Sequence, residues 1–250
     1  MHHALSIKHF AKSFGVLSVF EDISLSVDKQ EFVSIIGPSG CGKSTLFHIL
    51  AGVDKATSGE LFLDKKKITD SRGKFGYMPQ DASLLPWKTV LENVMIGPRI
   101  SGLAKTKAQE KATELLEKFN LQNFTNHYPA TLSGGMQQRV ALLRTVLFNP
   151  SFLLLDEPFG SLDALTRQDA QLWLLEVFKE FRSSVLFITH DIQEAILLSD
   201  RIYVFSSRPA KIMKEVPVNL PRPRKLTDLT SPRAVALEKQ LFSLLKQTKK

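Results

Sequence analysis

The sequence predicts an α/β fold with a mainly parallel core sheet, and three observations support this. The apolar run "EFVSII" leads through the glycine loop "GPSGCGKST" at residues 37–45 into the helical pattern "STLFHILAG". A second apolar run, "FLLLDE" at 152–157, precedes another helical pattern. Between them, residues 87–149 show helical spacing only. Strands that alternate with helices in this order form parallel sheets covered by helices.

The composition of the 250-residue chain indicates one large globular domain or two small ones. Its hydrophobic content of 43% is sufficient for a core. No apolar run approaches the roughly 18 residues that span a bilayer, and the opening "MHHALSIKHF" lacks the apolar core of a signal peptide. We therefore expect a cytoplasmic protein, or one held at a membrane by a partner.

The charge is concentrated at the C-terminal end. The chain carries 33 Lys and Arg against 25 Asp and Glu, a formal net charge of +8, and residues 221–250 contribute eight basic against two acidic residues, or +6. This distribution disfavours nucleic acid as a partner, because a nucleic-acid-binding domain spreads basic residues over a folded face. A basic end segment is more often solvated surface; contact with acidic lipid headgroups or a partner is the alternative. The single cysteine, Cys41, cannot form an internal disulfide.

The elements follow in chain order. Strands are expected around "SIKHF", "ISLSV" and "EFVSII", then a helix from Lys43 that ends at Gly52, and short strands around "ELFLD" and "KFGYMPQ". After the helical patterns "TKAQEKATELLEKFNL" and "QQRVALLRTVLF" come strand "FLLLDE", helix "ALTRQDAQLWLLEVFKEF" and strands "SSVLFITH" and "RIYVFS". Residues 217–232 contain four prolines and are expected to be extended, and residues 233–247 are expected to form a last short helix. We expect one domain over 1–250, with a catalytic core (1–86 and 150–220), a helical subdomain (87–149) and a basic C-terminal tail (221–250).

The glycine loop matches the pattern G-x-x-x-x-G-K-[ST] at Gly37, Gly42, Lys43 and Ser44, with a strand before it and a helix after it. Glycines let backbone N–H groups turn toward phosphates, and the helix N-terminus adds partial positive charge. Lys43 is expected to reach the β- and γ-phosphates, and Ser44 to ligate Mg²⁺. The residues expected to contact the nucleotide are Gly37, Pro38, Ser39, Gly40, Cys41, Gly42, Lys43, Ser44 and Thr45.

The run "FLLLDE" delivers Asp156 and Glu157 to the carboxyl end of a buried strand, where α/β sheets bind their ligands. Asp156 can hold Mg²⁺ through water, and Glu157 can orient and deprotonate an attacking water. An acidic pair at such a place can instead be a helix cap or surface charge. No N-K-x-D motif for guanine is present, so the sequence favours ATP over GTP.

Residues 132–139, "LSGGMQQR", lie between the phosphate loop and the acidic strand. In that order the chain resembles the ATP-binding subunit of an ABC transporter, over residues 5 to about 210 and six motifs. The resemblance implies a P-loop NTPase fold with an N-terminal antiparallel β subdomain and an inserted helical subdomain. It also implies that Phe14 of "KSFG" stacks on adenine, that Gln80 of "YMPQ" acts in catalysis and on Mg²⁺, that Asp163 of "SLD" lies at the nucleotide, and that His190 of "ITHD" contacts the γ-phosphate. Phe14, Gln80 or His190 taken alone would more often be structural.

The same resemblance implies that two copies pair head to tail. Ser133, Gly134 and Gly135 of one copy would cap the γ-phosphate held by the Lys43 loop of the other. The implied further partners are integral membrane permease subunits and, indirectly, an extracytoplasmic solute-binding protein, with the chain peripheral at the cytoplasmic face of the membrane. In "LLPWKTVLENV", Leu85 and Trp87 would line the permease groove, or Trp87 would be core.

Three positions depart from the usual family pattern without removing a nucleotide or metal contact: Gln30, Ser161 and the "ALLRT" stretch. The phrases "FGSLDALTRQ", "FSSRPAKI" and "LPRPR" resemble the importer branch for nitrate, taurine, aliphatic sulfonates and thiamine-precursor pyrimidines. The function expected is an ATP-hydrolysing importer motor. Two alternatives stay open: a soluble ABC ATPase that acts on ribosomes or nucleic acid, and the motor of an exporter.

Overall fold

The computed structural model describes residues 3–148 and 151–248. The expected boundary at 149 and 150, and the outermost residues at both ends of the chain, lie outside the described residues. The N-terminal part forms an antiparallel sheet in the order β2-β1-β4-β5. Its strands are β1 (His3–Phe14), β2 (Leu17–Asp28), β4 (Ser58–Leu63) and β5 (Lys66–Ile68).

The second sheet has the order β10-β9-β3-β8-β7-β6, and all of its strands except β10 run parallel to their neighbours. They are β3 (Phe32–Ile36), β6 (Gly76–Met78), β7 (Phe152–Asp156), β8 (Ser184–Ile188), β9 (Arg201–Phe205) and β10 (Ile212–Pro217). Every residue of β3, β7 and β8 is buried, as expected for parallel strands covered on both faces. The predicted mainly parallel core sheet is confirmed.

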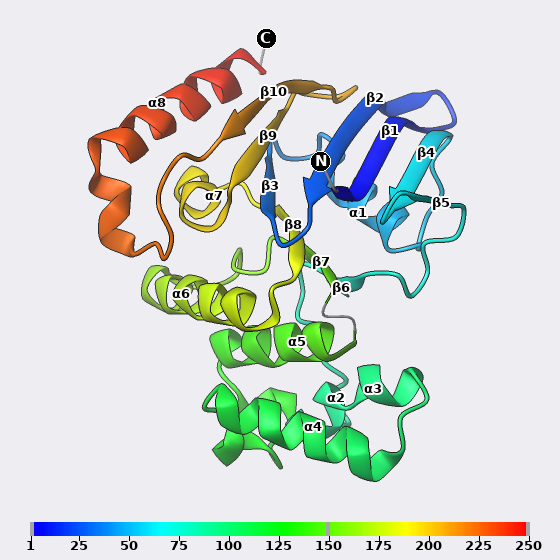
Figure 1. The fold of residues 1–250 in the computed structure, drawn as a ribbon, viewed down its shortest axis with the longest axis vertical. Coiled ribbons are helices and arrows are strands. Elements are labelled where there is room, and N and C mark those ends of the chain that lie inside the picture. Colours follow the sequence, from blue (N-terminus) through cyan, green and yellow to red (C-terminus); the bar gives the residue numbers. More distant parts are fainter. Residues whose placement is uncertain (1–2, 149–150, 249–250) are drawn as a thin grey trace.

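The helices cover both faces of this sheet and extend to one end of the molecule (Figure 1). They are α1 (Lys43–Leu50), α2 (Val90–Val94), α3 (Ile96–Ile100), α4 (Lys105–Lys118), α5 (Gly134–Phe148), α6 (Ala164–Phe181), α7 (Ile192–Leu198) and α8 (Pro232–Gln247). Short 3-10 turns occupy Gln122–Phe124, Pro129–Thr131 and Leu226–Thr230. In Figure 1, α2, α3 and α4 lie farthest from the sheet, and α5 and α6 lie between them and the strands. Across residues 3–148 and 151–248, each helix is too short or too polar to cross a lipid bilayer.

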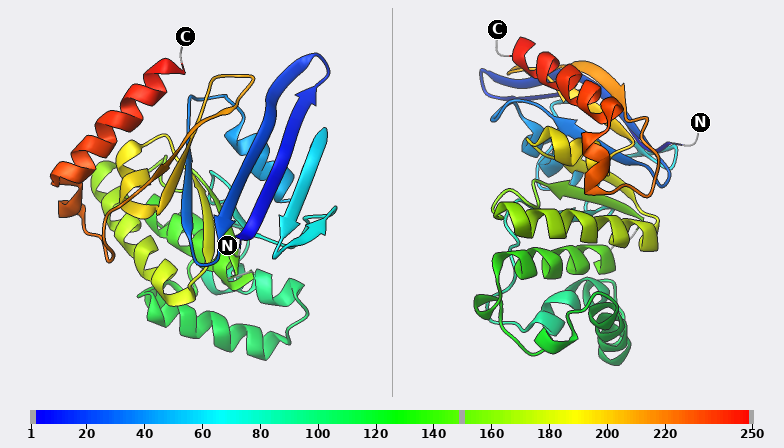
Figure 2. Two further views of the ribbon diagram at one scale, coloured as in Figure 1. Left: turned by 45° about the horizontal axis from the view of Figure 1, so that its top comes forward. Right: turned by 90° about the vertical axis from the view of Figure 1, so that its left-hand side faces the viewer.

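The hydrophobic core lies on both sides of the parallel sheet. On one side, α1 packs with the antiparallel sheet, through Phe47 and Phe20 among others. On the other side, α5 and α6 pack against the strands through residues such as Val140 and Leu174. The two views of Figure 2 show these layers stacked on one another. Residues of α2 and α4 belong to the same hydrophobic cluster as those of α5 and α6. The helical segment is therefore continuous with the core of the sheet.

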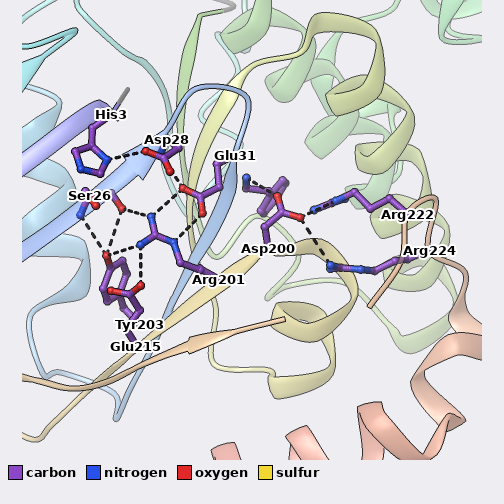
Figure 3. Close-up of polar contacts among 11 residues, drawn as sticks. His3, Ser26, Asp28, Glu31, Asp200, Arg201, Tyr203, Glu215, Arg222 and Arg224 are labelled. Atoms are coloured by element: carbon purple, nitrogen blue, oxygen red, sulfur yellow. Dashed lines mark hydrogen bonds and ion pairs between the residues drawn. The ribbon is translucent and has the colours of Figure 1, made fainter. Parts of the chain in front are cut away.

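The C-terminal segment is docked on the domain. Helix α8 packs on α7 and β9 through Ala234 and Leu241, which are both buried. Arg224 is 4% exposed and donates to the carbonyls of Ile196, Leu197 and Ser199 at the end of α7. The expectation of solvated surface is therefore wrong for this residue, because the free carbonyls of a helix end need donors. Asp200 accepts from Arg222 and also pairs with Arg224 (Figure 3).

Candidate functional site

The phosphate loop joins β3 to α1, as the sequence predicts. Gly40 and Gly42 have φ angles of +75° and +115°, which favour glycine. A Cβ on Gly42 would lie 2.6 Å from Val19 Cγ1. The loop backbone is therefore packed closely against Val19, and no space remains for a side chain at Gly42.

Lys43 is buried at the start of α1. Its Nζ donates to the carbonyls of Gly37, at 2.9 Å, and Pro38, at 3.0 Å. The ammonium group is thereby held within the curve of the loop. Phosphate oxygens of a nucleotide are the natural acceptors at this position, because Lys43 lies at the N-terminus of α1, which adds partial positive charge.

Ser44 and Asp156 meet as the sequence predicts. Ser44 Oγ donates to Asp156 Oδ1 over 3.2 Å, and Asp156 is 3% exposed at the end of β7. Burial raises the pKa of Asp156, which the hydrogen bond from Ser44 opposes. A hydroxyl and a carboxylate are ligands that suit Mg²⁺.

Gln80 does not join this pair. Its side chain is exposed, and in the described part of the chain it forms no hydrogen bond with Ser44 or Asp156. The Gln80 carbonyl is 3.5 Å from Gln138 Nε2, which can donate to it. The structure thus places the expected glutamine loop beside α5, with the Gln80 side chain not bonded to Ser44 or Asp156.

Glu157 and His190 are brought together by neighbouring strands. Glu157 follows β7, and its N–H donates to the Ile188 carbonyl of β8 over 2.9 Å. Glu157 Oε2 and His190 Nδ1 are 3.0 Å apart. The φ of Glu157 is +44°, a conformation that non-glycine residues adopt at a cost of about 1–3 kcal/mol and that clusters at functional sites.

Two supports of this site are absent from the sequence interpretation. Thr189, next to His190, donates to Glu194 Oε2 over 2.5 Å, and Gln171 donates to Glu194 Oε1 over 3.0 Å. The Arg144 guanidinium donates to the carbonyls of Ala82 and Ser83, at 2.8 Å each, and so holds the loop after Gln80. Their partners lie up to 62 positions away along the chain, so no local pattern reveals them.

The second glycine loop lies at the start of α5. Ser133 and Gly134 are exposed, and Ser133 Oγ accepts from the Met136 N–H over 3.3 Å. Asp163 is exposed and caps α6 by accepting from the Thr166 N–H over 3.1 Å. Hydrogen bonding from the Thr166 side chain and then from this N–H lowers the pKa of the Asp163 carboxyl. Within the described residues, no hydrogen bond or ion pair connects this loop to the phosphate loop.

The two aromatic residues for which the sequence predicts a binding role, Phe14 and Trp87, are exposed. Phe14 is 51% exposed at the end of β1, and Lys12 Nζ lies 4.3 Å from the centroid of its ring. Trp87 is 70% exposed, so it is not a core residue.

A glycine loop between strand and helix, with an acidic pair at the same edge of the parallel sheet, defines a P-loop nucleoside triphosphate hydrolase. The family model described as "ABC transporter" matches residues 20–160. The chain belongs to the ABC transporter family, as one of its ATP-hydrolysing cassettes.

Two relatives illustrate the similarity. The aliphatic sulfonates import ATP-binding protein SsuB of Bacillus cereus is 44% identical over 217 residues, or 87% of this chain and 85% of the relative. The nitrate import ATP-binding protein NrtD of Synechocystis sp. is 40% identical over 212 residues, or 85% of this chain and 80% of the relative.

Solved structures agree with the fold. The dimeric structure of MJ0796, a bacterial ABC transporter cassette, superposes with a TM-score of 0.74 at 32% identity and covers 86% of this chain and 99% of its own. A second dimeric structure of MJ0796, in a post-hydrolysis state bound to ADP and Pi, gives the same values. The predicted fold class is confirmed.

Proposed function

We propose that this chain is the ATP-hydrolysing motor subunit of an importer. The observation that supports it best is the convergence of two pairs at one sheet edge: Ser44 with Asp156, and Glu157 with His190. The first pair suits a divalent cation and the second suits an attacking water. Both lie at the carboxyl ends of parallel strands, where ligands bind.

Each residue has a role in this proposal. Loop 37–45 and Lys43 bind the phosphates of ATP, and Ser44 and Asp156 hold Mg²⁺, with Gln80 reaching it when the glutamine loop moves. When bound, Mg²⁺ neutralises charge on the phosphate oxygens. Glu157 accepts the proton of the attacking water, and His190 holds the γ-phosphate. Phe14, after its ring is freed from Lys12, stacks on adenine.

A second copy of the chain completes the site. Ser133 and Gly134 are exposed and separate from the phosphate loop of their own chain, so they are free to contact a partner. We propose a head-to-tail dimer in which Ser133, Gly134 and Gly135 cap the ATP bound by the partner, with Asp163 beside them. The dimeric MJ0796 cassette supports this arrangement.

A groove beside the helical segment suits an integral membrane permease. A cavity of about 270 Å³ lies between α1, β6, α3 and α5, and Val53, Ile96 and Phe148 line it. Val53 is 71% exposed, so an apolar side chain is available at the edge of the groove for a partner to bury. We propose that a cytoplasmic helix of the permease occupies this groove and also contacts the exposed Trp87 and the half-buried Leu85.

The proposed solute is a small anion of the sulfonate, taurine or nitrate class, or a thiamine-precursor pyrimidine, delivered by an extracytoplasmic solute-binding protein. The names of the sulfonate and nitrate relatives support the first class. They do not favour an exporter or a soluble ATPase acting on ribosomes or nucleic acid.

In this proposal the chain is peripheral at the cytoplasmic face of the membrane. We also propose the division into core (1–86 and 150–220), helical subdomain (87–149) and C-terminal segment (221–250).

The test is the Glu157→Gln variant. It keeps the side-chain shape but removes the proton acceptor, so we expect the rate of ATP hydrolysis to fall by at least about 100-fold while ATP binding is retained. Size-exclusion chromatography with ATP and Mg²⁺ should then show a stable dimer. Glu176→Gln, an exposed carboxylate of α6, is the matched control and should behave as wild type. Full hydrolysis by Glu157→Gln would contradict the proposed role of Glu157.

A further inference from the structure

The turn between β9 and β10, at residues 206–211, contacts the phosphate loop. The Arg208 guanidinium donates to the carbonyl of Gly40, 168 positions away along the chain. A Cβ built on Gly40 would have Arg208 Nη2 as its one neighbour within 4 Å, at 4.0 Å. Arg208 is therefore the side chain that covers this part of the loop.

The turn is also hydrogen-bonded to β2. The Ala210 N–H donates to the Val19 carbonyl over 2.9 Å, and the Glu21 N–H donates to the Ala210 carbonyl over 3.3 Å. Val19 is the residue that closes the space beside Gly42. The turn and the phosphate loop thus share a rigid neighbour, and the backbone of Arg208 has a defined position.

The end of the C-terminal helix is attached to the same turn. Ser207 Oγ donates to the carbonyl of Thr248, the residue that follows α8. Thr248 is buried, and its hydroxyl donates to the Leu245 carbonyl over 2.7 Å. A continuous set of contacts therefore runs from α8 through Ser207 and Arg208 to the phosphate loop.

We propose that Arg208 is a positioning residue of the phosphate loop, and that the C-terminal end of α8 fixes Arg208 through Ser207. The carbonyls of Gly37 and Pro38 are bound by Lys43, and that of Gly40 by Arg208. Gly40 and Arg208 are both exposed, so water could also bind this carbonyl, and the effect of Arg208 is to restrict rotation of the peptide that carries it. Arg208 thereby holds the Gly40 peptide in position for ATP.

The inference rests on the proposed binding of ATP by loop 37–45, and it is tested with Arg208→Met and Lys211→Met. Lys211 belongs to the same turn, is exposed, and its side chain forms no hydrogen bond or ion pair with the described residues. Both variants remove one positive charge, but only Arg208→Met removes the donor to Gly40. By isothermal titration calorimetry with Mg²⁺, we expect about tenfold weaker ATP binding for Arg208→Met, the scale of one charge-assisted hydrogen bond. Lys211→Met should stay within about twofold of wild type, and Arg208→Lys should recover part of the loss.

A second readout uses the protein without nucleotide. Hydrogen exchange of the peptide that covers 37–45 should be faster in Arg208→Met than in Lys211→Met or wild type, because the Gly40 peptide loses its restraint. Ser207→Ala should change exchange in the same direction, with about threefold weaker ATP binding.

The outcomes separate the two claims. If Arg208→Met equals Lys211→Met in both measurements, Arg208 does not position the loop. If Ser207→Ala equals wild type in both, α8 does not fix Arg208. A Lys43→Met variant tests the proposed function itself: unchanged ATP binding by this variant would overturn the role of the loop, whereas loss of binding leaves the two Arg208 results to decide the inference.

Discussion

Arg224 gives the sharpest prediction about stability. Its guanidinium, with 1% of the side chain exposed, donates to five carbonyls, of Ile196, Leu197, Ser199, Val218 and Leu220. The substitution Arg224→Met keeps most of the apolar stem and removes the four N–H groups that donate to these carbonyls.

The magnitude follows from two opposing effects. The four N–H groups of Nη1 and Nη2 form these contacts, and at about 1–1.5 kcal/mol each they stabilise the folded state by about 5 kcal/mol. Burial lowers the pKa of Arg224 from 12.5 to about 10, so burying the charge costs about 3 kcal/mol at about 1.4 kcal/mol for each pKa unit. The net loss expected in Arg224→Met is therefore about 2 kcal/mol. For a chain of this length the melting temperature should fall by about 4–8 °C.

The assay is thermal unfolding monitored by scanning calorimetry, with Arg222→Met as the matched control. Arg222 also donates to Asp200 and to the Leu198 carbonyl, but 29% of its side chain is exposed. Exposed ion pairs contribute little, so Arg222→Met should lose less than about 1 kcal/mol. Equal melting temperatures for the two variants, or a wild-type value for Arg224→Met, would refute the reasoning.

Three further predictions concern the nucleotide site. Ser133→Ala should lower ATP hydrolysis by about tenfold and leave ATP binding by the monomer unchanged; loss of monomer binding in a titration would contradict capping by a partner. Cys41 is 2% exposed and burial raises the pKa of its thiol, so a thiol reagent at pH 7 should react slowly and inhibit ATP hydrolysis, and ATP should slow the reaction further; equal labelling rates with and without ATP would contradict occupation of the loop. Gly42→Ala should abolish ATP binding and lower the melting temperature. The control Gly15→Ala, where φ is +56° and a Cβ would have nothing within 4 Å, should lower the free energy of unfolding by only about 1 kcal/mol. Equal melting temperatures for the two variants would contradict the close packing of Val19 against Gly42.

The parts of the fold that the sequence predicts are those whose signals are local. The strand before the phosphate loop and β7 are continuous apolar runs, α1 and α6 have helical apolar spacing, and each of these elements has a motif at one end. The C-terminal end of α1 follows from Gly52, whose φ of +77° matches the expected end of the helix. For the same reason Ser44 and Asp156 could be paired from sequence, since both follow buried strands whose ends meet at one sheet edge.

The parts that the sequence does not predict depend on distant partners. Strand β10 has mixed burial and pairs at an edge of the sheet, and α7 has seven residues, so neither shows a clear period. A basic segment with prolines predicts exposure, yet Arg224 is buried because α7 offers it carbonyls 25–28 positions earlier. Such pairing becomes visible only when the topology brings the two segments together.

The second glycine loop and the proposed catalytic base are mechanically connected within one chain. A Cβ on Gly135 would lie 2.4 Å from Thr166 Cγ2, and one on Gly134 would lie 3.7 Å from Leu162 Cδ2, so the start of α5 fits closely against the start of α6. Leu162 belongs to the short segment from Glu157 to Asp163, in which the Gly160 N–H donates to the Glu157 carbonyl over 3.1 Å. In the proposed dimer, Ser133 contacts the ATP of the partner, so we expect closure of the dimer to act through α5 on the segment that carries Glu157. Because the left-handed conformation of Glu157 is strained, dimer closure can control the position of Glu157 as well as cap ATP.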